Sequence, residues 1–368
     1  MGGFGANYLA SLYSDNRKII ANSSELKSTI TNLSQEKIIS FDTEFIRHKT
    51  YWPVLCSIQM HTKNNSILID TLSTEINLEP LKVILSDKKI LKIFHAHTQD
   101  LEILNNELNI KISNIFDTQI AASFLGYDDQ ISYQKLVEKI LDIELDKKER
   151  ISDWTNRPLS KKQLIYALND VKYLHELYKP LSEKLSQEKK LSWMNEEMKL
   201  CVNNIFEKSD TQENNYSILY KKIYDFREEI AQKNNVPRKW VFEDKIIRDF
   251  ITSKDRKNLV MKIKSDFIDL SEKTNLYNFI EIYLQNNRII NNIRKKKLSS
   301  TQNKLLIRIS TYLDKTSIMY NVSRGLISNR KDIEEIILND DPYNKSLFGW
   351  RKEIFGNNAL IIKNGENL

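Results

Sequence analysis

The stretch IISFDTEF at residues 38–45 decides the fold, because it sets two acidic residues into an apolar, β-branched run typical of a buried strand. Asp42 and Glu44 stand two residues apart in this run. Side chains of a strand alternate between its faces, so both carboxylates are predicted to emerge on one face. Alternatively, the pair ends the strand and faces water, or pairs with Arg47. Two buried like charges are costly unless cations neutralise them, so the apolar setting favours a cation site.

Strands and helices alternate downstream of this stretch. Three consecutive strands indicate a meander, whereas later strands separated by helices indicate parallel pairing. The predicted fold class is therefore α/β, a mixed sheet flanked by helices. Strands are predicted at residues 54–60, 65–70, 90–96 and 114–116, and helices at 78–87, 98–105 and 118–124.

Beyond residue 133 the pattern becomes helical. Ser160 supplies an N-cap for a long helix that begins at residue 161, and Pro180 either kinks or divides that helix. Further helices are predicted at 133–141 and 191–208. The polar stretch SDTQENNYS at 209–217 is the predicted linker to the last third of the chain.

Asp100, Tyr166 and Asp170 extend the acidic pattern. Asp100 follows a predicted strand near the start of a helix, where an acid on its own is also typical of a first turn that favours the helix dipole. Tyr166 and Asp170 are four residues apart on a predicted helix and project from one face, although Tyr166 could equally pack in the core with Asp170 at its edge. His95 and His97 could be metal ligands, but histidines at strand ends more often make structural hydrogen bonds.

Together these residues predict a site for hard cations. Four carboxylates from three separate segments offer only oxygen ligands, which suit Mg²⁺ or Mn²⁺. Two such ions about 4 Å apart stabilise the attacking and leaving oxygens of an in-line phosphoryl displacement. A tyrosine beside one ion would orient the attacking water through its hydroxyl.

The composition predicts two or three packed domains, because the chain has 368 residues of which 40% are hydrophobic and 29% are charged. Residues 1–220 carry 27 Lys and Arg against 30 Asp and Glu, whereas residues 221–368 carry 29 against 19. The basic part indicates a phosphate-binding surface, although basic helices are also common as solvated faces.

The cysteine content and the hydropathy pattern indicate the cellular compartment of the protein. Cys56 and Cys201 are the only cysteines and lie far apart in apolar surroundings, which indicates a reducing environment. We find neither a signal-peptide pattern nor an apolar run of the roughly 18 residues that a membrane span needs. We therefore expect a soluble, cytoplasmic monomer with no membrane partner.

The last third contains an internal repeat. Residues 219–251 align without gaps on residues 305–337, and the Asn-Val-x-Arg sequence that begins at Asn235 falls on the one that begins at Asn321. Two amphipathic helices could match by chance, but the shared break favours duplication and predicts two small all-helical domains. The segment that joins them carries a basic cluster suited to phosphates, namely Arg294, Lys295, Lys296 and Lys297.

The order Asp-x-Glu, then Asp, then Tyr-x-x-x-Asp resembles the DEDDy group of 3′→5′ exonucleases, and the surrounding sequence is similar to ribonuclease D. Residues 42–59, 95–104 and 152–178 resemble that family's three exonuclease motifs, and residues 224–247 resemble a helicase-and-RNase-D C-terminal (HRDC) domain. One departure is visible: Ile151 stands where the family usually has a basic residue.

The resemblance implies three domains. Residues 1–208 would form an α/β exonuclease domain with a ribonuclease H-like mixed sheet. Residues 214–290 would form a first HRDC domain, and residues 300–368 a second, HRDC-like domain.

The resemblance also implies roles for the site residues. Asp42 would bridge two divalent ions, Mg²⁺ or Mn²⁺, and Glu44 and Asp170 would complete the site of the ion that binds the attacking water. Asp100 would support the second ion, and Tyr166 would position the water.

The implied activity is hydrolysis of RNA 3′ ends, with release of 5′-mononucleotides. The implied substrates are tRNA precursors and other structured RNAs with 3′ extensions. The alternatives are a DNA exonuclease of the same group, which the 2′-hydroxyl would distinguish, or a catalytically inactive RNA-binding protein.

Two further segments are predicted to contact RNA. Tyr51 and Trp52 could stack on the terminal nucleotides without regard to sequence, or could simply pack on the sheet. The basic cluster at residues 294–297 would contact phosphates.

Overall fold

The computed structural model describes residues 17–47, 49–145, 148–206, 215–263, 266–287, 298–338 and 344–365. The chain divides into two compact units. The first comprises Met1–Ile46, Leu55–Ser209 and Ser299–Leu368, and the second comprises Arg47–Val54 and Asp210–Leu298.

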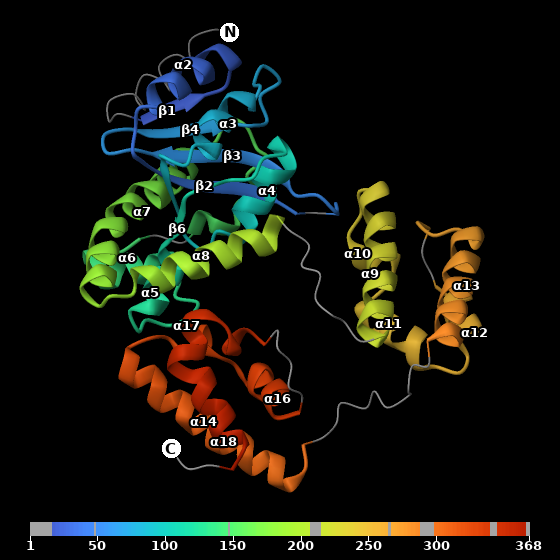
Figure 1. The fold of residues 1–368 in the computed structure, drawn as a ribbon. Helices are drawn as coiled ribbons and strands as arrows, with labels where there is room; N and C mark the ends of the chain where they lie inside the picture. Colours follow the sequence, from blue (N-terminus) through green and yellow to red (C-terminus); the bar gives the residue numbers. More distant parts are fainter. Residues whose placement is uncertain are drawn as a thin grey trace. The chain divides into compact units, whose positions relative to one another are not determined.

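A six-stranded sheet forms the core of the first unit (Figure 1). Its strands are β1 (Arg17–Ile20), β2 (Ile38–Ile46), β3 (Val54–His61), β4 (Ser66–Asp70), β5 (Leu91–Phe94) and β6 (Ile115–Asp117). The strand order is β1-β4-β3-β2-β5-β6. β4 pairs antiparallel with β3 and parallel with β1, whereas β5 pairs parallel with both β2 and β6. The predicted mixed sheet is confirmed, although the first strand was not predicted.

Helices cover both faces of this sheet. On one face, Ile39 and Phe41 of β2 belong to a core that also contains residues of α2 (Ser23–Leu33), α3 (Lys82–Ser86) and α4 (Thr98–Leu108). On the other face, α7 (Lys161–Gln187) packs across β2, β4 and β5. The cluster of buried residues on that side is Cys56, Leu68, Trp154, Leu159, Leu164, Ala167 and Leu168.

α7 carries two of the predicted site residues, and its start is fixed by a capping box. Ser160 Oγ accepts from the Gln163 backbone N–H at 3.1 Å, and Gln163 Oε1 accepts from the Ser160 N–H at 2.9 Å. Pro180 lies inside the helix and does not divide it. The remaining helices of this part are α5 (Thr118–Phe124), α6 (Tyr133–Leu141) and α8 (Leu191–Phe206).

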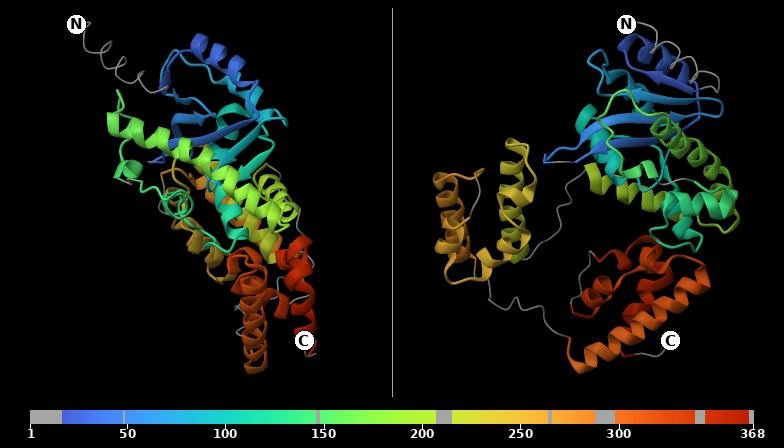
Figure 2. Two further views of the ribbon diagram at one scale, coloured as in Figure 1. Left: turned by 90° about the vertical axis from the view of Figure 1, so that its left-hand side faces the viewer. Right: turned by 180° about the vertical axis from the view of Figure 1, so that it is seen from behind.

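The C-terminal helices of the first unit dock on this α/β part. They are α14 (Ser300–Tyr320), α15 (Arg324–Ile327), α16 (Arg330–Leu338), α17 (Gly349–Arg351) and α18 (Asn357–Lys363), with α14 packed along α18 (Figures 1 and 2). The buried Lys190 ammonium donates to the carbonyl oxygens of Phe124 and Asn321, each at 2.9 Å. Arg351 forms a bidentate ion pair with Glu197 of α8, at 2.6 and 2.8 Å.

Apart from the segment Arg47–Val54, the elements of the second unit that the structure describes are all helices. Its helices are α9 (Asn215–Lys233), α10 (Arg238–Val241), α11 (Asp244–Thr252), α12 (Arg256–Met261) and α13 (Leu270–Asn286). They enclose a core of their own, to which Ile223, Ile247 and Ile280 contribute.

The internal repeat of the sequence is also a repeat of structure. α15 and α16 begin and end 86 residues after α10 and α11, respectively. The ion pair between Arg238 and Glu228 recurs at the same spacing between Arg324 and Asp314. The two helical segments therefore share one local architecture. The names and limits of the HRDC domains remain predictions, and most of the predicted linker at 209–217 lies outside the described residues.

Among the described residues, every helix is either too short or too polar to span a lipid bilayer.

Candidate active site

β2 presents its two acidic residues toward α7. Ser40 Oγ donates to the Val171 carbonyl oxygen of α7 at 2.8 Å, and Asp42 and Glu44 follow Ser40 at alternate positions of the strand. Phe41, one position out of phase, packs in the core on the opposite face. The alternation of the strand therefore brings both carboxylates to one face.

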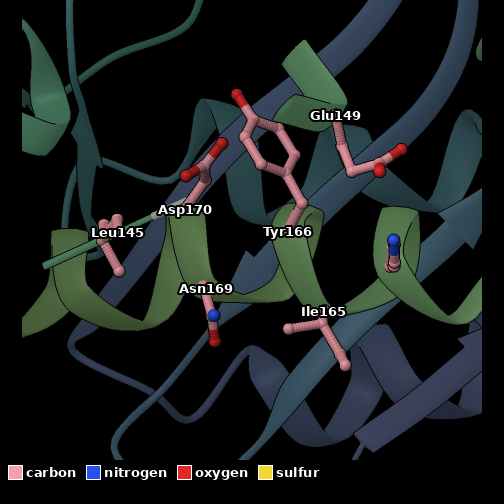
Figure 3. A pocket seen from close by; sticks show the side chains of 7 residues that line it. Leu145, Glu149, Ile165, Tyr166, Asn169 and Asp170 are labelled. Atoms are coloured by element: carbon pink, nitrogen blue, oxygen red, sulfur yellow. The ribbon is translucent and has the colours of Figure 1, made fainter. Parts of the chain in front are cut away.

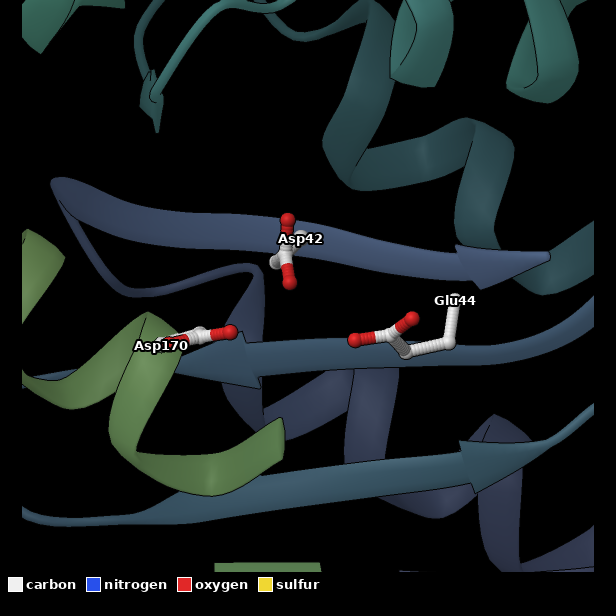
Figure 4. Close-up of side chains that lie close together, drawn as sticks. All are labelled: Asp42, Glu44 and Asp170. Carbon is white, nitrogen blue, oxygen red and sulfur yellow. The ribbon is translucent and has the colours of Figure 1, made fainter. Parts of the chain in front are cut away.

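A third carboxylate comes from α7. Oxygens of Asp42, Glu44 and Asp170 all lie within 4.8 Å of one another (Figure 4). Asp170 stands one turn after Tyr166, and the nearby Tyr166 hydroxyl lowers the pKa of the Asp170 carboxyl, opposing the larger effect of burial. Two segments far apart in the sequence thus form a cluster of three carboxylates beside a phenol, as the spacing predicts.

Asp100 approaches the cluster from α4, on the other side of β2. Thr43 points to that side, and its Oγ1 donates to Asp100 Oδ1 at 2.5 Å. Asp100 lies in the first turn of α4, so it both favours the helix dipole and borders the acidic cluster. It is not one of the three residues whose carboxylate oxygens converge within 4.8 Å.

Burial raises the pKa of all four carboxyl groups. For Glu44, burial and then the charges of Asp42, Asp170 and Asp100 raise the pKa to about 10. Burial raises the pKa of Asp170 to about 7. Burial and the charge of Asp170 move the pKa of Asp42 well above its ordinary value, and burial and Asp42 do the same for Asp100. A bound cation would oppose these shifts, because it favours the ionised carboxylates.

The carboxylates face a cavity of about 800 Å³. In the described part of the chain, no lysine or arginine lines it. Its polar wall consists of His95, Gln99, Gln119, Gln130, Ser132, Tyr133 and Gln134, of which the sequence analysis had considered only His95. Tyr133 donates to the Asn169 carbonyl oxygen at 2.8 Å and so ties α6 to α7. Among the residues that the sequence analysis missed, only Gln99 carries a signal, because it stands next to Asp100.

His95 and His97 make structural hydrogen bonds. This was the alternative to a role as metal ligands. His97 Nδ1 lies 2.7 Å from Asp117 Oδ2, which also accepts from the His97 backbone N–H at 2.8 Å. His95 Nδ1 lies 2.9 Å from Thr118 Oγ1, and its Nε2 lies 3.1 Å from the Ile131 carbonyl oxygen. Neither histidine belongs to the three-carboxylate cluster.

Tyr51 packs within the second unit, against α9. Its hydroxyl donates to Glu228 Oε2 at 2.7 Å and accepts from Gln232 Nε2 at 2.9 Å. Its backbone N–H donates to Asn235 Oδ1 at 3.1 Å. The ring of Trp52 meets that of Tyr51 edge-on and is 40% exposed, so the predicted stacking of these residues on RNA stays a prediction. The basic cluster Arg294, Lys295, Lys296 and Lys297 lies outside the described residues.

Comparison with known proteins identifies the family to which the chain belongs. A family model described as a 3′-5′ exonuclease matches residues 18–186. The ribonuclease D of Granulibacter bethesdensis is 31% identical over 366 residues, which cover 95% of this chain and 93% of the relative. The ribonuclease D of Nitrobacter hamburgensis is 30% identical over 364 residues, which cover 95% of each chain. The chain belongs to the ribonuclease D family. The predicted resemblance is confirmed.

Solved structures agree on the fold. The crystal structure of Escherichia coli RNase D, an exoribonuclease involved in structured RNA processing, matches with a TM-score of 0.77 at 22% identity. The match covers 96% of this chain and 100% of that chain. The catalytic core of RRP6 from Trypanosoma brucei matches with a TM-score of 0.52 at 20% identity, covering 75% of this chain and 81% of that one. The ribonuclease D fold therefore includes the helical C-terminal region as well as the α/β domain.

Proposed function

We propose that this 3′→5′ exoribonuclease of the ribonuclease D family hydrolyses the terminal phosphodiester of RNA at the Asp42–Glu44–Asp170 cluster. The observation that carries the proposal is the convergence of three carboxylates within 4.8 Å in a cavity that no described lysine or arginine lines. The family membership supports the activity, and the cluster supports its location.

The side chains of the cluster fit divalent metal ions. Their donor atoms are all carboxylate oxygens, which hard ions such as Mg²⁺ and Mn²⁺ prefer. Asp42 is central in our assignment and would contact both ions, Glu44 and Asp170 would hold the ion on the water side, and Asp100 would support the other. Once bound, two such ions lower the pKa of the attacking water and neutralise charge on the attacking and leaving oxygens.

The protein's own part in the reaction is positioning. Burial, then the negative charges of Asp170, Glu44 and Asp42, raise the pKa of the Tyr166 hydroxyl, which therefore stays protonated. A protonated phenol hydrogen-bonds to a water and orients it, but it is a poor base. Thr43 holds Asp100 in place from the opposite face of β2. The aligned water then attacks phosphorus opposite the 3′-oxygen that leaves with the shortened RNA.

For the substrate, we propose tRNA precursors and other structured RNAs with 3′ extensions, processed in the cytoplasm. The amide-rich wall of the cavity supports a ribose substrate, because amides both donate to and accept from hydroxyl groups. The 2′-hydroxyl is the group that would separate RNA from DNA.

The test uses an end-labelled, 3′-extended tRNA and the full-length protein. The wild type is expected to release 5′-mononucleotides with Mg²⁺ or Mn²⁺ and to be inactive with EDTA. Asp42→Asn should lower the rate by about a thousandfold or more, because it removes the central metal ligand. It should not unfold the protein, because a neutral amide of the same shape removes a buried charge.

Glu102→Gln is the matched control, because Glu102 is an exposed acid of α4 two residues from Asp100 and should leave the rate unchanged. An Asp42→Asn protein that degrades the RNA at the wild-type rate would refute the site. A matched DNA strand degraded as fast as the RNA would refute the preference for ribose.

A further inference from the structure

A second, smaller cavity adjoins the active site. Its volume is about 150 Å³, and Tyr166 and Asp170 line both cavities. Figure 3 shows these two side chains rising from α7, with Glu149 near Tyr166. The other residues that line it are Leu145, Lys162, Ile165 and Asn169. The phenol and one carboxylate of the active site therefore stand between a large and a small cavity.

Lys162 gives the smaller cavity its positive charge. In the described part of the chain, it is the one lysine or arginine that lines either cavity. It lies one helical turn before Tyr166, so both project from the same face of α7. The described residues offer its ammonium group no acidic partner within ion-pair distance, and the side chain is exposed. Its charge is therefore available to a ligand.

In-line hydrolysis adds negative charge to the phosphate on the side from which the water attacks, the side of Tyr166. The water oxygen forms a bond to phosphorus as the bond to the leaving 3′-oxygen breaks, so the new oxygen stands where the water stood, beside Tyr166. One proton of the water is released, and the 3′-oxygen of the shortened RNA takes up one. The product phosphomonoester then loses a further proton near neutral pH, so its charge approaches −2. Charge that the substrate lacked thus appears on the Tyr166 side of the site, and Tyr166 also lines the smaller cavity that contains Lys162.

We propose that Lys162 and the cavity beside Tyr166 form a binding subsite for the phosphate of the released nucleoside 5′-monophosphate. The inference rests on the proposed function, because it takes the water side of the site from the role of Tyr166. Asn169 is a second donor in the same wall. Glu149 is an acid in that wall and opposes the anion, which limits how tightly the product is held.

The subsite makes opposite predictions for two neutral substitutions. Lys162→Gln should weaken binding of adenosine 5′-monophosphate by about three- to tenfold, the effect of one exposed cation on a doubly charged anion. Glu149→Gln should tighten it by about two- to threefold, because it removes a repulsive charge. Lys161→Gln is the matched control: Lys161 is the exposed neighbour at the start of α7 and lines neither cavity.

The measurement is calorimetric titration of the Mg²⁺-loaded full chain with adenosine 5′-monophosphate, with adenosine as the ligand that lacks the phosphate. Adenosine affinity should be the same in all four proteins. Product inhibition during RNA hydrolysis should weaken by the same factor in Lys162→Gln, while the KM for RNA stays unchanged. Thermal unfolding confirms that each variant is folded.

Equal affinity of wild type and Lys162→Gln for the monophosphate overturns the subsite. A raised KM for RNA with unaltered monophosphate affinity also overturns it, because Lys162 would then bind the RNA backbone. Failure of the proposed function looks different: the wild type would not hydrolyse RNA in any metal, whatever its affinity for the monophosphate.

Discussion

We predict that the acidic cluster lowers the free energy of unfolding of the metal-free protein as pH rises. Burial raises the pKa of Asp170 from its ordinary 3.8 to about 7. Because the pKa is higher in the folded state, the native protein binds this proton more tightly than the unfolded chain does. The resulting stability is present at low pH and is lost as pH rises from about 3.8 through about 7.

The size of the effect follows from the same values. At about 1.4 kcal/mol per pH unit between 3.8 and about 7, ionised Asp170 destabilises the metal-free fold by roughly 4 kcal/mol at pH 8. Asp170→Asn carries no charge at any pH. It should therefore be more stable than the wild type at pH 8, by up to roughly 4 kcal/mol, and nearly equal to it at pH 4.

The assay is urea unfolding in EDTA across pH 4–8, followed by the fluorescence of tryptophans such as Trp154, which is buried against α7. The informative quantity is the difference between wild type and Asp170→Asn, since it cancels the titration of the rest of the chain. Saturating Mg²⁺ should reverse the order, because a bound ion stabilises only the wild-type cluster. A difference that stays constant from pH 4 to pH 8 would show that the carboxylates are not electrostatically coupled to folding, and the argument for a cation site would fail.

Two further predictions follow from single contacts. Tyr166→Phe should lower kcat by roughly ten- to hundredfold, the effect of one lost positioning hydrogen bond, without raising the Mg²⁺ concentration needed for half-maximal activity. A changed Mg²⁺ requirement would assign Tyr166 to metal binding instead. Arg351→Ala should destabilise the fold by about 3–5 kcal/mol in urea unfolding, because it removes the only cation paired with the buried Glu197 carboxylate among the described residues. The exposed neighbour Lys352 supplies the control, and equal midpoints for Arg351→Ala and Lys352→Ala would contradict the role of the ion pair.

Local periodicity was sufficient to predict which side chains share a face. The spacing of Asp42 and Glu44 on a strand, and of Tyr166 and Asp170 on a helix, depends only on the geometry of one element. Both pairs lie as that geometry requires: Asp42 and Glu44 face Asp170 (Figure 4), and Tyr166 and Asp170 rise together from α7 (Figure 3). Asp100 was harder to place, because its position depends on how α4 packs beneath β2.

Contacts between segments far apart in the sequence could not be predicted from local sequence patterns. Thr43 stands between Asp42 and Glu44, and strand alternation alone turns it to the opposite face, but its partner Asp100 is fixed by tertiary packing. The packing of Tyr51 on α9 was not predicted, because the side chains that hold it are more than a hundred residues away. The small cavity beside Tyr166 likewise depends on the short 3-10 helix Lys148–Ile151, which carries Glu149 and whose position no local sequence pattern predicts.

In the duplicated helical segments, an asparagine at equivalent positions binds a different loop in each copy. Asn235 and Asn321 occupy equivalent positions and both adopt left-handed backbone conformations, with φ of 49° and 48°. Asparagine tolerates this region better than most residues. Asn235 Oδ1 accepts from the backbone N–H groups of Tyr51 and Trp52, whereas Asn321 Nδ2 donates to the Leu125 carbonyl oxygen. An amide side chain both donates and accepts, so asparagine can bind a loop that presents N–H groups or one that presents a carbonyl oxygen. Duplication could therefore preserve the turn while its binding partner changed.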